Sequence, residues 1–314
     1  MSILETIGRT PLVPLRHVAT GLPVAVLAKC EHLNPGGSVK DRLALAICDD
    51  AEARGVLKPG ATLIEATAGN TGMGLALVAA VRGYRLVCVM PEKMSVDKRT
   101  ALASLGAEVI ITPNAPLDSP DNFQNVARRL AAEHGWFLTD QFCNPANVRI
   151  HETVTAPDIL AQCEAQHGRP PAAFVAGAGT GGTITGVGRC FRARGLDARV
   201  VLADPVGSGL AHWVREGVNG PDGAYQVEGI GASRPSEILD RSVIDEAETV
   251  SDEESFVMTR RLWAEEGLLV GGSAGTAVVA ALRVAARVSG GPVVVLLPDS
   301  WDRYWSKPWA RVAG

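Results

Sequence analysis

Short runs of β-branched residues alternate with longer runs rich in alanine and leucine along most of the chain. Such alternation is typical of βαβ units, in which neighbouring strands are parallel and the crossovers are right-handed. We therefore predict an α/β fold of parallel, twisted sheets flanked by helices. The predicted strand and helix pairs are Val24–Lys29 with Ser38–Arg54, Thr62–Glu65 with Asn70–Arg82, Arg85–Met90 with Ser95–Leu105, Glu108–Thr112 with Asp121–His134, and Ala173–Ala176 with Thr180–Arg194; further strands are Arg199–Ala203 and Pro292–Leu297.

Length and composition exclude several classes of protein. The 314 residues predict two domains, at about 150 residues per domain. The net charge of −4 and the aromatic content of 5% disfavour a nucleic-acid surface. No apolar run reaches the roughly 18 residues that span a bilayer, and the first residues do not resemble a secretory signal. The cysteines and histidines show no metal-ligand spacing, so we expect a cytoplasmic protein without a metal.

Four glycine-rich turns each join a predicted strand to the start of a helix. The first runs from Asn34 to Arg42 and reads Asn-Pro-Gly-Gly-Ser-Val-Lys-Asp-Arg, which places Lys40 in the first turn of a helix. The positive end of the helix dipole favours a neutral amine there, as a nucleophilic lysine requires. The alternative is an ordinary solvated lysine.

The second turn, Thr67–Gly72, points free backbone N–H groups at any anion bound there, and Asn70 and Thr71 add side-chain donors. This pattern indicates a carboxylate site. The alternative is a simple helix N-cap. The fourth turn, Gly271–Gly275, offers the hydroxyl of Ser273 either to a ligand or, again, as an N-cap.

The third turn, Gly177–Thr183, is typical of a loop that cradles a phosphate at a helix N-terminus. It also fits the dinucleotide pattern G-x-G-x-x-G, with Asp204 22 residues after Gly182 where a ribose-binding acid is expected. An NAD-dependent oxidoreductase is therefore an alternative. It leaves the lysine turn and the second turn without a role, however. A lysine, a phosphate cradle, a carboxylate site and a hydroxyl donor together match what pyridoxal phosphate needs.

At this point the chain resembles the cysteine synthase / cystathionine β-synthase family, which are fold-type II pyridoxal-phosphate enzymes with a tryptophan synthase β-like fold. The resemblance extends from Ile7-Gly-Arg-Thr-Pro-Leu to Leu297-Pro-Asp-Ser. Its motifs are the segments 34–42, 67–72, 179–183, 229–231 and 272–275.

The resemblance implies that pyridoxal 5′-phosphate is the cofactor, that Lys40 binds it covalently, and that Lys40 then moves the α-proton of the substrate. Asn70 would bond to the 3′ oxygen of the cofactor, and Ser273 would face its ring nitrogen. The phosphate would be held by Gly179, Thr180, Gly181, Gly182 and Thr183. The substrate carboxylate would be held by the segment Thr67, Ala68, Gly69 and Thr71, together with Gln141.

The resemblance further implies a large cofactor-binding domain at 1–42 plus 147–314, a small mobile substrate domain at 43–146, and a homodimer. The implied reaction is β-replacement on an activated L-serine derivative (O-acetylserine-like, O-phosphoserine-like or serine) by sulfide or another thiol-type nucleophile, giving L-cysteine or a related β-substituted alanine. A cystathionine β-synthase-like or specialised-pathway synthase is the alternative. A binding protein without catalysis is disfavoured because Lys40 and the phosphate turn are intact.

Some motifs depart from the cysteine synthases. Ala68 stands where the family usually has serine, which removes one hydroxyl from the carboxylate turn. The segments Val81–Tyr84 and Met90–Ser95 look more like the cystathionine β-synthases, whereas Ala232-Ser233 looks like the cysteine synthases. The sequence therefore leaves the substrate pair open.

Overall fold

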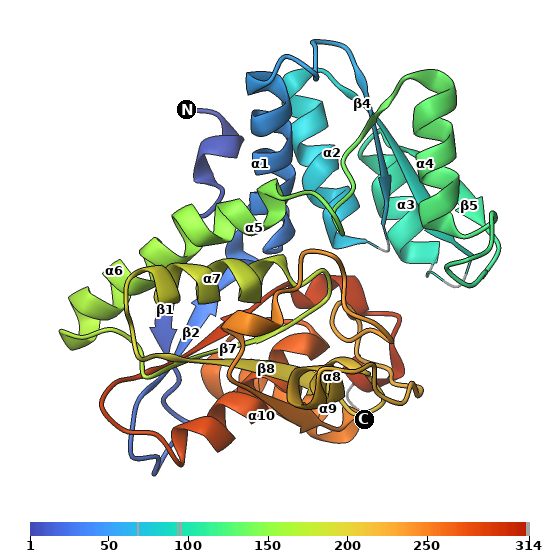
Figure 1. Ribbon diagram of the computed structural model, residues 1–314. Coiled ribbons are helices and arrows are strands. Elements are labelled where there is room, and N and C mark those ends of the chain that lie inside the picture. The colour runs from blue at the N-terminus through green and yellow to red at the C-terminus, as the bar shows by residue number, and fades with distance from the viewer. Residues whose placement is uncertain (68, 93, 95, 312–314) are drawn as a thin grey trace. The chain divides into compact units, whose positions relative to one another are not determined.

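The computed structural model describes residues 1–67, 69–92, 94 and 96–311. Its contacts divide the chain into two compact units. Unit 1 comprises Met1–Gly8 and Asn34–Asn147, and unit 2 comprises Arg9–Leu33 and Val148–Gly314. Each unit has its own sheet with helices on both faces, as the ribbon shows (Figure 1).

Unit 1 is built on a parallel sheet in the order β5-β4-β3-β6. Its strands are β3 (Thr62–Ala66), β4 (Arg85–Pro91), β5 (Glu108–Thr112) and β6 (Phe137–Leu138). Apolar residues of one sheet face pack with α1, α2 and α3, and those of the other face pack with α4. The helices are α1 (Lys40–Ala53), α2 (Asn70–Arg82), α3 (Val96–Ser104) and α4 (Phe123–His134).

Within its described residues, unit 2 has a six-stranded sheet in the order β1-β2-β10-β7-β8-β9, parallel except for the pairing of β1 with β2. Its strands are β1 (Leu12–Pro14), β2 (Val26–Cys30), β7 (Ala173–Gly177), β8 (Arg199–Pro205), β9 (Glu246–Val250) and β10 (Val293–Leu297). Its α-helices are α6 (Ala156–His167), α7 (Gly182–Ala193), α8 (Leu210–Glu216), α9 (Asp252–Glu266) and α10 (Gly272–Ala285). The short α5 (Ala146–Ile150) and a π-helix (His151–Thr155) precede α6.

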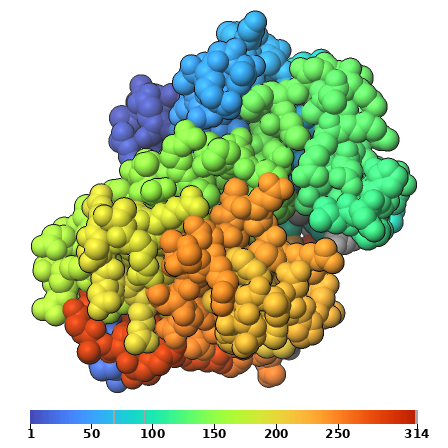
Figure 2. Space-filling view, viewed as in Figure 1, coloured from blue at the N-terminus to red at the C-terminus, as the bar shows by residue number. Residues whose placement is uncertain are grey.

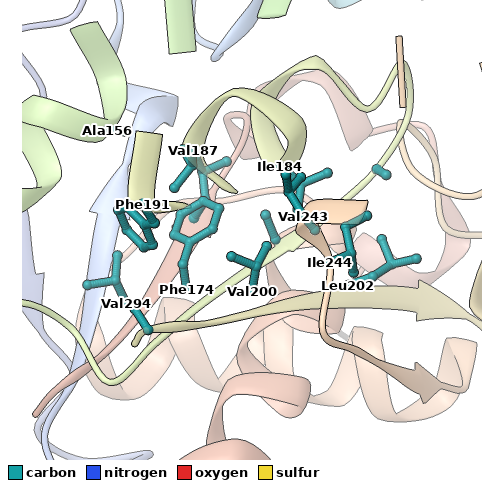
Figure 3. Close-up of a cluster of buried hydrophobic side chains, with 14 of the residues drawn as sticks. Ala156, Phe174, Ile184, Val187, Phe191, Val200, Leu202, Val243, Ile244 and Val294 are labelled. Carbon is teal, nitrogen blue, oxygen red and sulfur yellow. The ribbon is translucent and has the colours of Figure 1, made fainter. Parts of the chain in front are cut away.

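Helices α6, α7 and α8 cover one face of the unit 2 sheet, and α9 and α10 cover the other. In the space-filling view, the light green and yellow side chains of α6 and α7 form the outer surface over the first face (Figure 2). Beneath them, Phe174 of β7 meets Phe191 of α7 edge to face, with the ring centroids 6.3 Å apart (Figure 3). None of the described helices is long and apolar enough to cross a bilayer.

Every strand predicted from the sequence is present, with ends that differ by one or two residues. Three strands were not predicted. β1 has three residues and ends in proline, β6 has two residues, and the edge strand β9 alternates acidic with apolar residues. Such short or half-exposed runs lack the apolar pattern of buried parallel strands.

The boundary between the units differs from the predicted domain boundary at residues 42 and 43. Helix α1 is continuous from Lys40 to Ala53, so the whole helix belongs to unit 1. It lies so close to α2 that a Cβ on Gly74 would stand 2.9 Å from the carbonyl oxygen of Lys40. The division into a cofactor-binding domain and a mobile substrate domain stays a prediction.

Gly275, in the fourth glycine-rich turn, gives a test of helix packing in unit 2. A Cβ there would lie far inside van der Waals contact of the Ser255 carbonyl oxygen, where α10 crosses α9. We expect Gly275→Ala to lower the free energy of unfolding by about 2 kcal/mol or more in urea titrations. The control is Gly223→Ala at an exposed position, where the nearest atom is 3.3 Å away. Equal stability of the two variants would contradict the packing role.

Candidate active site

The lysine turn leads into α1 of unit 1 and is held by a glycine with positive φ and a backbone-to-side-chain hydrogen bond. Gly37 has a φ of +77°, and the N–H of Gly36 donates to Asp41 Oδ2 at 2.5 Å. A Cβ on Gly36 would collide with the Asp41 carboxylate, so glycine is required at this position. The Ser38 hydroxyl accepts from the backbone N–H of Lys40 at 3.2 Å. Lys40 is the first residue of α1 and is half-buried, as the sequence predicted for the start of a helix.

The carboxylate turn joins β3 to α2, and the hydroxyl of Thr67 accepts hydrogen bonds from within it. Thr67 Oγ1 accepts from the N–H groups of Gly69 and Gly72, at 3.1 and 3.3 Å. Thr67 therefore holds the turn together, whereas Asn70 opens the helix as its first residue and Gly69 takes the N-cap position. Ala68 lies outside the described residues.

Thr71 and Gln141, 70 positions apart in the sequence, are brought together by a buried hydrogen bond. The Thr71 hydroxyl donates to Gln141 Oε1 at 2.6 Å. The amide nitrogen of Gln141 donates to the carbonyl oxygen of Ala66 at 3.0 Å, at the end of β3. Gln141 is 5% exposed. Both predicted carboxylate-binding side chains therefore lie at the N-terminal end of α2.

Sequence reasoning missed Glu65, which lies beneath this pair and is 1% exposed. Its carboxylate accepts from the Thr139 hydroxyl and from the backbone N–H of Gln141, the latter at 3.2 Å. Burial raises the pKa of Glu65 to about 7, although the hydrogen bonds from Thr139 and Gln141 lower it. The signal in the sequence was a single acidic residue in the otherwise uncharged strand Thr62–Ala66.

The phosphate turn of unit 2 leaves the N-terminus of α7 without a side-chain cap at its N-cap residue. That residue, Gly181, has a φ of +84°. A Cβ on Gly179 would stand 2.5 Å from the carbonyl oxygen of Gly229, so the turn lies directly against the 229–231 motif. Thr180 is buried, and its hydroxyl is 3.5 Å from the N–H of Gly182. Backbone N–H groups at the positive end of a 12-residue helix are suited to hold an anion.

A buried histidine forms a hydrogen bond to a residue of this turn, and the sequence did not predict that role. His151 Nε2 is 3.1 Å from the hydroxyl of Thr183, and Nδ1 is 3.0 Å from the hydroxyl of Thr155. His151 lies in the π-helix before α6, and α7 approaches that segment closely because residue 186 is glycine. Its hydrogen bond orients Thr183, one of the predicted phosphate ligands.

Ser273 is the second residue of α10 and is 2% exposed. The N-cap residue of α10 is Gly271, so Ser273 is not the cap that the alternative interpretation required. Within the described part of the chain, the Ser273 hydroxyl makes no hydrogen bond. It is a buried neutral donor that remains for a ligand.

Asp204 lies at the carboxyl end of β8, but its carboxylate is engaged within the protein. It is fully buried, and its carboxylate accepts from the backbone N–H of Ala211 at 2.7 Å. Burial raises the pKa of Asp204 to about 6. The structure therefore gives no support to the NAD-dependent alternative. Among residues 1–67, 69–92, 94 and 96–311, no three His, Cys, Asp or Glu side chains gather in a way that would hold a metal ion.

Comparison with known proteins shows the family to which the chain belongs. The model of the family described as "pyridoxal-phosphate dependent enzyme" matches residues 3–299. The cystathionine beta-synthase of Oryctolagus cuniculus is 47% identical over 311 residues, which are 97% of this chain and 55% of that protein. The enzyme of the same name from Dictyostelium discoideum is 45% identical over 309 residues, which are 98% of this chain and 61% of that protein. This chain therefore spans little more than half the length of these curated relatives.

Solved structures extend the similarity over the whole fold. The crystal structure of an O-ureido-L-serine synthase is 41% identical, with a TM-score of 0.89, covering 98% of this chain and 94% of that one. The O-acetylserine dependent cystathionine beta-synthase from Helicobacter pylori is 38% identical, with a TM-score of 0.87, covering 98% of this chain and 97% of that one.

The cap formed by Thr67 is tested by Thr67→Val, which leaves the N–H groups of Gly69 and Gly72 without their acceptor. We expect the free energy of unfolding to fall by about 1–2 kcal/mol. The matched control is Thr112→Val, because in the described residues the buried Thr112 hydroxyl has no hydrogen-bond partner. That variant should be as stable as the wild type. A Thr67→Val protein as stable as Thr112→Val would show that the hydroxyl does not hold the turn.

Proposed function

The chain belongs to the pyridoxal-phosphate dependent enzyme family, and we propose that it catalyses β-replacement on an activated L-serine derivative. The observation that carries the proposal is the start of α7. The N-cap residue there is Gly181, which has no side chain to cap the backbone N–H groups, and the turn before it packs against the carbonyl of Gly229. That donor set fits the phosphate of pyridoxal 5′-phosphate. Without these N–H donors, the family match alone would not connect residues 179–183 to the cofactor.

The residues present fit the remaining parts of the cofactor. We assign the phosphate to the segment 179–183, the ring nitrogen to the Ser273 hydroxyl, and the 3′ oxygen to Asn70. Ser273 is buried and neutral, so it supplies a hydrogen bond rather than a negative charge. Pyridoxal phosphate, when bound, supplies an electron sink for the negative charge that develops at Cα of an amino acid.

Lys40 is assigned two tasks in this proposal. Its amine holds the cofactor covalently in the resting enzyme, and it afterwards removes the proton from Cα of the substrate. The fixed turn formed by Gly36, Gly37 and Asp41 limits the positions that the start of α1 adopts. The positive end of the helix dipole disfavours the charged ammonium of a lysine at this position.

The α-carboxylate of the substrate is assigned to the turn Thr67–Gly72 and to Gln141. The N-terminal end of α2 favours an anion. Thr67 shapes the turn, and the hydroxyl of Thr71 lies against the amide of Gln141. Ala68 and Gly69 complete the assigned set. Holding the carboxylate fixes the substrate so that its Cα proton faces one base, which is how positioning lowers the barrier.

The substrate pair is the finer part of the proposal. We favour O-acetyl-L-serine, O-phospho-L-serine or L-serine as the first substrate, and sulfide or another thiol as the nucleophile, giving L-cysteine or a related β-substituted alanine. The names of the similar proteins include an O-acetylserine dependent cystathionine beta-synthase, which supports the thiol class. A homodimer and a cytoplasmic location stay predictions from the sequence.

A second candidate is a specialised β-substituted alanine synthase with a nucleophile other than a thiol. The similarity to an O-ureido-L-serine synthase at 41% identity favours it. The two candidates differ in the nucleophile and therefore in the product. Incubating the holoenzyme with each serine derivative together with sulfide, L-homocysteine or hydroxyurea, followed by mass spectrometry, distinguishes them. A thiol product formed fastest supports the first candidate, and an O-ureido product formed fastest supports the second.

Gly179→Ala tests the assigned phosphate turn. The new Cβ would press on the Gly229 carbonyl at 2.5 Å and displace the turn. We expect the affinity for pyridoxal phosphate to fall about tenfold or more, which corresponds to roughly 1.4 kcal/mol. Pyridoxal without the phosphate is the control ligand, and its affinity should change much less. An equal loss for both ligands would place the phosphate elsewhere.

Lys40 is tested by reducing the holoenzyme with borohydride and mapping the labelled peptide. The reduced cofactor should be on Lys40, and Lys40→Ala should lower kcat by at least about 100-fold, as expected for loss of a general base. The control is Lys58→Ala, an exposed lysine of the same unit, which should keep full activity. Label on another lysine would overturn the assignment.

A further inference from the structure

Glu65 is a buried carboxyl group to which the proposed mechanism gives no role. It lies on β3, directly before the carboxylate turn, and is 1% exposed. The two oxygens of its side chain have different partners. Oε2 accepts from the Thr139 hydroxyl and from the backbone N–H of Gln141, whereas Oε1 accepts from the side-chain amide of Gln141 at 3.4 Å. Glu65 therefore controls the orientation of the Gln141 amide.

The donors of this cluster are already in use. The side-chain amide of Gln141 has two hydrogens, and its nitrogen donates to the carbonyl oxygen of Ala66 and to Glu65. The single hydroxyl hydrogen of Thr71 goes to Gln141 Oε1. A substrate carboxylate carries acceptors only. To receive a hydrogen bond from Gln141, it must compete with Glu65 for the same N–H group.

An ionised Glu65 would also repel a second carboxylate nearby. The titratable groups that face it are Asp140, in the turn after β6, and the thiol of Cys88 on β4. Asp140 adds negative charge, and burial raises the pKa of Cys88 to about 12, so the thiol stays neutral near pH 7. From α2, the polar residue of the cluster is Thr71, which is uncharged, and α4 packs on the opposite face of the sheet.

We propose that Glu65 is a positioning residue that takes up one proton when an amino-acid carboxylate binds the turn Thr67–Gly72. The proton comes from solvent and forms an O–H bond at Oε1, the oxygen that faces the Gln141 amide. One N–H of Gln141 is thereby released to the substrate carboxylate. This inference rests on the proposed function, because it takes the turn as the carboxylate site.

The geometry makes this uptake effective near neutral pH. Burial raises the pKa of Glu65 to about 7 before any ligand binds. An added negative charge close by disfavours the ionised form further. Binding of a carboxylate is therefore strong below about pH 7, where Glu65 is already neutral. It weakens as the pH rises above about 7, because Glu65 must then be protonated from a lower concentration of protons.

Propionate is the probe for the experiment, since it has a carboxylate but no amine to react with the cofactor. Its dissociation constant is measured on the holoenzyme by calorimetry at pH 6 and pH 8, in two buffers of different ionisation enthalpy. For the wild type we expect the constant to rise about tenfold between these pH values, together with uptake of a fraction of a proton per propionate at pH 7.

Glu65→Gln mimics the neutral carboxyl group, so its affinity for propionate should be nearly the same at both pH values and the proton uptake should be lost. The matched control is Glu108→Gln, the same change at an exposed glutamate of the same sheet, which should behave as the wild type. An identical pH dependence and proton uptake in wild type and Glu65→Gln would overturn the proposal.

Thr139→Val gives an independent measurement if Glu65→Gln does not fold. The hydroxyl of Thr139 lowers the pKa of Glu65, so its loss should move the fall in propionate affinity to higher pH by about half a unit to one unit. An unmoved transition counts against the proposal. Propionate that fails to compete with the amino-acid substrate at any pH overturns the carboxylate site itself, which is a different result from competition without proton uptake.

Discussion

The start of α7 is the feature on which the proposed site depends. The first N–H groups of any α-helix have no partner within the helix. At α7 the N-cap residue is Gly181, which has no side chain to satisfy them. An anion can replace the missing cap, and it gains the favourable end of the helix dipole. In unit 1, Thr67 instead supplies a hydroxyl that ties the start of α2 into a turn.

Close approach to the backbone of another segment accounts for several glycines in the motifs or directly beside them. Gly179 lies against the carbonyl oxygen of Gly229, Gly74 against that of Lys40, and Gly275 against that of Ser255. None of these positions has room for a Cβ. The motifs therefore encode the packing of turns and helices as much as ligand contacts. Hydrogen bonds also fix these turns, since the Ser38 hydroxyl accepts from the backbone N–H of Lys40 and the Thr183 hydroxyl bonds to His151.

The alternation of strands and helices and the four turns were predictable from the sequence, because they depend on local periodicity and on glycine. The cluster of Glu65, Thr139 and Gln141 was not predictable, because it joins positions 74 to 76 residues apart through β3 and β6. β6 has only two residues and leaves almost no pattern. The hydrogen bond between Thr183 and His151 was missed because it also joins positions far apart in the sequence.

The central claim is that the backbone N–H groups at the start of α7 hold the phosphate of the cofactor as a dianion. Phosphorus-31 NMR of the holoenzyme measures the ionisation of that phosphate directly. The account predicts a resonance that stays at the dianion position between roughly pH 5.5 and 8.5, because helix N–H groups stabilise the charged form. A resonance that titrates with a midpoint near 6, as a solvent-exposed phosphate monoester does, would contradict it.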